Sequence, residues 1–172
     1  MVYQEFSEKT KSDIGVMALS DDRKLTPFLH SEFNEVAGQL SPDNRWMAYA
    51  SDDSGSLEIY VTSFPTSGGK RRISDHGGSR PRWRRDGKEL FYVSGDRDLM
   101  AVDVSTSSGA AAFSAGSPKR LFHLPIGGVF EVFPDYGYDV TADGQRFLVN
   151  KFVEATPASI TLATNWTAAL RK

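Results

Sequence analysis

Apolar residues occur along this chain in runs of about five that often alternate with polar residues, and short polar turns separate the runs. In three places an Asp-Asn or Asp-Gly turn lies between two such runs, at residues 40–51, 83–94 and 140–150. These residue pairs tolerate the positive φ that a tight hairpin requires, so each segment predicts a β-hairpin. We therefore predict a structural role for the turn residues, which are Asp43, Asp86, Gly87, Asp143 and Gly144.

Further strand-like runs recur in phase with these hairpins. One set comprises residues 14–19, 59–64, 99–104 and 160–165, and another comprises residues 25–29, 70–74 and 119–123. The three turn aspartates lie 43 and then 57 residues apart. The first interval matches the repeat of a β-propeller blade, which is about 40–45 residues. Pro27 falls in a run that we assign to a sheet edge, where its missing N–H breaks no ladder.

The pattern predicts an all-β fold, a partial β-propeller of about 3.5 four-stranded antiparallel blades. The blades form a single domain over residues 1–172. We expect an incomplete first blade at residues 1–34, without its innermost strand, and complete blades at 35–79 and 80–125. The fourth blade, at residues 126–172, is expected to lack its outermost strand.

Composition narrows the classes of function. The 172 residues carry a net charge of only −2, which gives no attraction to nucleic acid or to an anionic membrane. No apolar stretch approaches the ~18 residues of a membrane helix, and the N-terminus lacks a signal-peptide core. As written, the chain is expected in the cytoplasm, and a periplasmic or membrane-attached parent protein is left open. Cysteine is absent, so we expect no disulfide and no thiolate metal site.

Several stretches resemble the TolB-like and WD-repeat-like propeller repeats of bacteria, in particular the propellers C-terminal to serine/threonine protein kinases. These stretches are residues 33–35, 41–49, 58–61, 78–83, 86–92 and 160–166. The resemblance implies the propeller fold, which hosts many functions. The chain departs from the family in having no kinase domain, no membrane span and too few blades to close a ring. It is therefore expected to be the C-terminal part of a longer propeller.

The most distinctive charged feature is a basic stripe. Arg80, Arg82 and Arg84 alternate along a predicted inner strand, so their side chains are expected on one face, with Trp83 opposite in the core. Inner strands line the central channel, and with His76 at its mouth this stripe suits a carboxylate or phosphate ligand. The alternative is that the arginines pair with acidic residues of neighbouring blades and that His76 is a solvated loop residue.

Other candidate sites are weaker. The Asp52-Asp53 pair suits either a surface cation or, more simply, a polar turn. Histidines lack the spacing of a metal chelate, and neither a Gly-x-Ser-x-Gly elbow nor a recognisable Ser, His and Asp cluster is present. We expect no enzyme activity, no metal and no cofactor.

The sequence thus favours a non-catalytic module for protein or peptide recognition. Two alternatives stay open: an anion or small-molecule sensor that uses the arginine-lined channel, and the accessory propeller of a hydrolase. An incomplete ring leaves blade faces uncovered, so we expect the chain to associate with itself, as a homodimer with two-fold symmetry. Neither nucleic acid nor a membrane is an expected partner.

Overall fold

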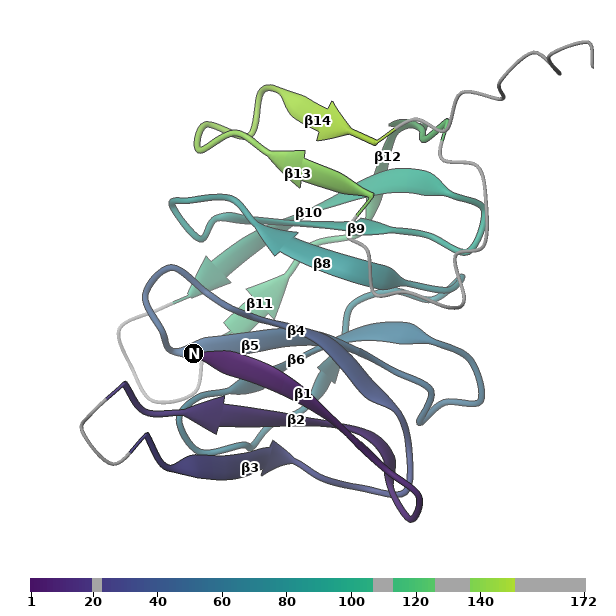
Figure 1. Cartoon of the computed structure of the whole chain (residues 1–172). Coiled ribbons are helices and arrows are strands. Elements are labelled where there is room, and N and C mark those ends of the chain that lie inside the picture. Colours follow the sequence, from purple (N-terminus) through teal and green to yellow (C-terminus); the bar gives the residue numbers. More distant parts are fainter. Residues whose placement is uncertain (20–22, 107–112, 126–136, 151–172) are drawn as a thin grey trace, which may run out of the picture.

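Antiparallel sheets stacked face to face make up the fold (Figure 1). The structure is a computed structural model, and it describes residues 1–19, 23–106, 113–125 and 137–150. Every regular element in these residues is a β-strand. Within the same ranges no helix is long and apolar enough to cross a membrane.

The first two sheets follow the chain order. The first has the order β1-β2-β3, and the second has the order β4-β5-β6-β7. Their strands are β1 (Val2–Ser7), β2 (Lys11–Met17), β3 (Leu25–Leu29), β4 (Glu35–Leu40), β5 (Trp46–Ser51), β6 (Glu58–Ser63) and β7 (Arg71–Arg72). Pro27 lies on β3, at an edge of the first sheet, as its missing N–H requires.

The third sheet is larger, and the fourth is described in part. The third has the order β11-β10-β9-β8, and β12 also pairs with β10. The strands are β8 (Ser79–Trp83), β9 (Glu89–Val93), β10 (Asp98–Thr106), β11 (Phe113–Ala115), β12 (Lys119–His123), β13 (Tyr138–Val140) and β14 (Phe147–Val149). The predicted strand at 160–165, and Trp166, lie outside the described residues.

The sheets pack face to face through three apolar clusters, and the central strands β5, β6 and β9 bury both faces. Ile14, Met47 and Tyr49 join the first sheet to the second. A larger cluster that includes Trp46, Val61 and Tyr92 joins the second sheet to the third. The last described joint packs strands β9 and β10 against β13 and β14. This arrangement is that of propeller blades around an axis.

The predicted fold class, an all-β partial propeller with four-stranded antiparallel blades, is confirmed. Details differ from the expected strands. Strand β7 covers only two residues of the run predicted at 70–74, although Ile73 still donates a backbone hydrogen bond to Ile59. Strand β11 was not predicted, because three residues are too few to show a periodic pattern. The predicted blade boundaries stay a prediction.

Contacts that the first sheet shares with the second show which positions of a blade the strands β1, β2 and β3 occupy. Tyr3 pairs across the strands with Gly15 as Tyr49 pairs with Tyr60. Asp13 on β2 hydrogen-bonds His30, just after β3, as Glu58 on β6 accepts a hydrogen bond from Ser74 beyond β7. Strands β1, β2 and β3 therefore take the places of β5, β6 and β7. The place that β4 fills beside β5 is open beside β1 in the described chain.

Candidate functional site

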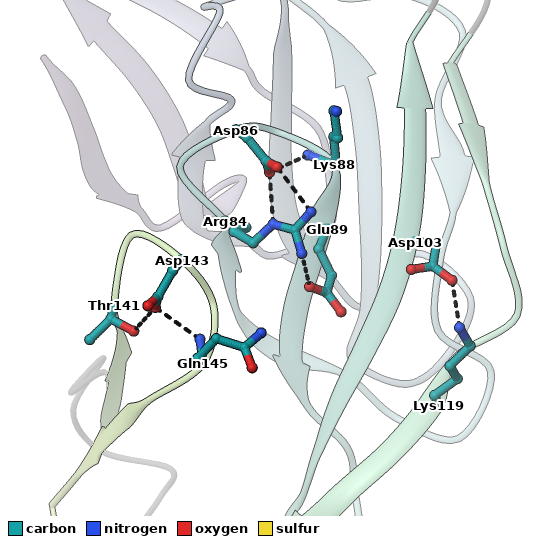
Figure 2. Close-up of polar contacts among 9 residues, drawn as sticks. All are labelled: Arg84, Asp86, Lys88, Glu89, Asp103, Lys119, Thr141, Asp143 and Gln145. Atoms are coloured by element: carbon teal, nitrogen blue, oxygen red, sulfur yellow. Dashed lines mark hydrogen bonds and ion pairs between the residues drawn. The ribbon is translucent and has the colours of Figure 1, made fainter.

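The three aspartate turns share one hydrogen-bond arrangement, which Figure 2 shows for Asp86 and Asp143. In each, the carboxylate accepts the backbone N–H of the residue two positions later, and the residue two positions earlier donates to the carboxylate from its side chain. The contacts join Asp43 to Arg45 and Ser41, Asp86 to Lys88 and Arg84, and Asp143 to Gln145 and Thr141. These aspartates hold their own turns closed.

Successive turns also lie against one another, from blade to blade. Gly87 and Gly144 both have φ of 72°, a conformation that glycine adopts without strain. A Cβ placed on Gly144 would lie 2.7 Å from the Cδ atom of Arg84, and one on Gly87 would lie 3.7 Å from Pro42. The turns therefore form one continuous end of the molecule.

The structure corrects the predicted arginine stripe. The pairing of β8 with β9 shifts register between Ser79 and Arg82, and Arg80 has a φ of 55°. This β-bulge breaks the alternation on which the prediction depended. Arg84 lies beyond the end of β8, where it binds Asp86 and, at 2.8 Å, Glu89 (Figure 2). Arg80, Arg82 and Arg84 therefore do not alternate along one regular strand.

The other residues of the predicted anion site, Arg80, Arg82 and His76, make different contacts from one another. Arg80 is buried, and its carbonyl accepts a hydrogen bond of 2.8 Å from the Tyr138 hydroxyl. The Nε atom of Arg82 lies 3.6 Å from a carboxylate oxygen of Asp139, on the next sheet. The His76 side chain is 84% exposed and hydrogen-bonds Asp75, which raises the pKa of the imidazole. Trp83 packs in the core between the sheets, as expected.

The electrostatics of the turns follow from these contacts. The hydrogen bonds from Arg84 lower the pKa of Asp86 to about 2, and the backbone N–H of Lys88 adds to the effect.

Asp52, a residue of the predicted polar turn, accepts two hydrogen bonds from Asn34 and lies 3.6 Å from Lys11. Its neighbour Asp53 binds Lys70. Lys11 lies on the first sheet, so Asp52 links two sheets, whereas Asp53 and Lys70 both adjoin strands of the second sheet. In the described residues no cluster of three metal-ligating side chains occurs.

One repeated hydrogen bond, between an acidic residue and a polar residue of the next strand, was not predicted from the sequence. Asp13, Glu58 and Asp98 stand at or near the start of the third strand of a blade, and each binds a residue near the end of the fourth. The partners are His30, Ser74 and His123. The sequence does contain a signal for this contact, since an acidic residue precedes each apolar run and a polar residue follows the next strand-like run. It was missed because the partners lie 16 to 25 positions apart.

The edge of β1 that faces away from β2 carries groups suited to recognition. Met1 and Met17 exchange two backbone hydrogen bonds, of 2.9 and 2.8 Å. Bonded pairs alternate along an antiparallel ladder, and β1 pairs with β2 without a shift. The N–H and C=O groups of Val2, Gln4 and Phe6 therefore point away from β2. Within the described chain, no strand pairs with them.

A groove runs beside this edge. It has a volume of about 480 Å³ and lies between β1 and β4. Val2, Ile14 and Leu40 give it apolar walls, while Gln4 and Gln39 supply amide groups. The site thus combines unpaired backbone groups with side-chain contacts, which are the two elements of strand recognition.

Comparison with known proteins supports the fold alone. No protein-family profile matches the sequence, and no curated protein matches it either. A solved structure assigned as TolB from Agrobacterium tumefaciens is similar, with 23% identity, a TM-score of 0.56 and 72% of this chain covered. TolB from Acinetobacter baumannii has 17% identity, a TM-score of 0.57 and 84% coverage. A protein assigned as a 6-phosphogluconolactonase from Bacteroides uniformis has 14% identity, a TM-score of 0.52 and 86% coverage.

This chain spans less than half of the length of each of these proteins. The matched part is 45% of the Agrobacterium protein, 33% of the Acinetobacter protein and 46% of the Bacteroides protein. The chain therefore has a TolB-like propeller fold over part of the length of these structures.

Proposed function

We propose that this chain is a non-catalytic recognition module that binds an extended polypeptide segment along the free edge of β1. The outward-facing backbone groups of Val2, Gln4 and Phe6 are the observation that carries the proposal. An added strand forms main-chain hydrogen bonds with such an edge, and these bonds supply affinity for any extended segment. The groove beside β1 supplies selectivity through its apolar walls and its two glutamine side chains.

A non-catalytic role is favoured by how the charged groups are used. The groups with shifted pKa values lie in separate places and serve local structure: Asp86 closes a turn, and Asp98 binds Arg120 on β12. The sequence contains no nucleophile elbow. Catalysis needs a nucleophile, a base and an orienting group within reach of one another, and these shifted groups do not supply that set.

The test uses a peptide copy of residues 33–42, which contain β4, because β4 fills in the second blade the place that is open beside β1. We expect saturable binding by calorimetry. In hydrogen exchange, the backbone amides of Val2, Gln4 and Phe6 are expected to become protected.

Gln4→Pro is the matched variant. It removes one outward N–H and leaves the ladder with β2 intact, so it is expected to weaken peptide binding by about tenfold or more. Gln4→Ala keeps the N–H and controls for loss of the side chain. Absence of peptide binding, or equal binding by the proline variant, would contradict the proposal.

A kinase-linked parent is a second proposal, carried by the resemblance of stretches such as residues 41–49 and 86–92. An antibody against this chain is then expected to detect, in cells of the source organism, a polypeptide much larger than 19.0 kDa. Mass spectrometry of that band identifies the kinase domain. A band at 19.0 kDa alone would rule out the parent.

A further inference from the structure

The residues that lie opposite one another across the strands near Glu5 show which kind of segment the free edge of β1 is suited to bind. Strands β1 and β2 take the places of β5 and β6, and Tyr3 corresponds to Tyr49. Two residues further along each strand, Glu5 corresponds to Ser51. The second blade therefore shows what a strand added beside β1 would meet at each position.

In the second blade, this row of cross-strand neighbours has a neutral residue at its middle. Glu35 on β4 pairs with Ser51 on β5, and Ser51 pairs in turn with Glu58 on β6. The small serine side chain separates the two acidic residues. In the first blade the middle position is Glu5, and its partner on β2 is Asp13. A strand added beside β1 thus places a residue next to a glutamate instead of a serine.

Glu5 is exposed, and in the described part of the chain it forms no ion pair. Asp13, directly opposite on β2, carries the same charge, and its carboxylate hydrogen-bonds Thr10 and His30. Like charges directly opposite one another in a sheet are unfavourable, whereas opposite charges are favourable. A basic residue in the added strand would pair directly with Glu5, and an acidic residue there would add a third carboxylate to the row.

Phe6, the next residue of β1, calls for an apolar neighbour. Its counterpart in the second blade is Asp52, which accepts hydrogen bonds from the backbone and the side chain of Asn34, just before β4. Phe6 cannot accept such bonds. It is 79% exposed and lies on the same face of β1 as Val2, which packs in the joint with the second sheet. An apolar side chain in the added strand would remove apolar surface of Phe6 from water.

We propose that the β1 edge selects a basic segment, a strand with a lysine or arginine opposite Glu5 and an apolar residue opposite Phe6. Because β4 and β5 are antiparallel, the apolar residue directly precedes the basic one in the segment. The backbone groups of β1 bind any extended segment, and Glu5 and Phe6 add the preference. This inference rests on the proposed function and specifies the class of polypeptide partner.

The test compares the 33–42 peptide with the same peptide carrying Glu35→Lys, by calorimetry on the wild-type chain and on Glu5→Lys. The substituted peptide is expected to bind the wild-type chain about fivefold more tightly, and the order of the two peptides is expected to reverse on Glu5→Lys. The difference is expected to shrink as salt is added. Glu8→Lys, in the turn after β1, changes the net charge equally and is expected to keep the wild-type order.

The apolar contact has a test of its own. The 33–42 peptide carrying Asn34→Leu is expected to bind the wild-type chain about threefold more tightly than the unchanged peptide, and Phe6→Ser is expected to abolish that gain. Absence of binding by all of these peptides would contradict the proposed function. Binding of the unchanged peptide that Glu35→Lys does not strengthen, or the same peptide order on Glu5→Lys as on wild type, would overturn this inference alone.

Discussion

Glu35 is a carboxyl group enclosed at the joint between the first two sheets. Its residue is only 5% exposed, one carboxylate oxygen accepts a hydrogen bond from Ser31, and the other has no partner in the described chain. Burial raises the pKa of Glu35, and the nearby negative charge of Asp13 raises it further. The folded state therefore holds the Glu35 proton more tightly than the unfolded state does.

This gives a pH-dependent prediction for Glu35→Gln. The pKa of Glu35 in the folded state lies above its ordinary value of 4.5. The protonated Glu35 side chain therefore contributes most to the free energy of unfolding below pH 4.5, and this contribution is lost as the pH rises through the folded pKa. Glutamine keeps an acceptor for Ser31 and carries no charge. Relative to wild type, the variant is expected to gain stability between pH 4.5 and pH 7, measured by urea unfolding at several pH values.

The control is Glu32→Gln, which removes one negative charge at an exposed position nearby. A stability difference between Glu35→Gln and wild type that stays constant with pH would contradict the assignment of the raised pKa.

At the scale of elements, the inner strands β4 and β8 carry the same irregularity. The pairing shifts between Val36 and Gln39 in one and between Ser79 and Arg82 in the other. In each, one residue other than glycine has a positive φ, 57° at Ala37 and 55° at Arg80. Each of these residues lies six positions before its turn aspartate. The bulge is thus a repeated feature of the blade, and it sets which side chains face the groove.

A left-handed alanine costs free energy that glycine avoids, so Ala37→Gly is expected to stabilise the protein by about 0.5–1 kcal/mol. The measurement is the free energy of unfolding by chemical denaturation. Ala48→Gly is the contrasting control, because Ala48 lies in the regular part of β5 and is fully buried. That control is expected to lose about 1 kcal/mol or more. Destabilisation by both variants would argue against backbone strain at Ala37.

At the scale of the whole molecule, the two terminal sheets each have a face that no further sheet covers in the described chain. Large apolar side chains are exposed on both, including Leu25 on β3 at 57% and Leu148 on β14 at 76%. Contiguous exposed apolar surface is uncommon on monomers and marks interaction sites. We propose self-association through these terminal sheets, with a two-fold dimer as the expected form.

Sedimentation equilibrium is expected to show a mass above 19.0 kDa that depends on concentration. Leu25→Ser and Leu148→Ser are each expected to weaken association about tenfold, because each removes a large apolar contact. Leu57→Ser, at a partly exposed position of the second blade, is the control and is expected to leave the mass unchanged. A monomer at all concentrations would contradict the prediction.

The sequence by itself determined the local structure of this protein. Alternating apolar runs specify strands, and Asp-Gly or Asp-Asn between them specifies a hairpin, because both signals act over a few neighbouring residues. Their recurrence at Asp43, Asp86 and Asp143 also predicted repeated blades. The strand at Lys119–His123 lies where its pattern placed it.

Tertiary structure decided what depends on packing between blades. Whether Arg84 faces a channel or closes a turn depends on where β8 ends, and the bulge at Arg80 has no signal in residue type. Trp46 reads as a core residue in the sequence, and only the stacking of two sheets buries its indole N–H without an acceptor among the described residues. These features arise from contacts between residues far apart in the chain, which a pattern of neighbouring residues does not encode.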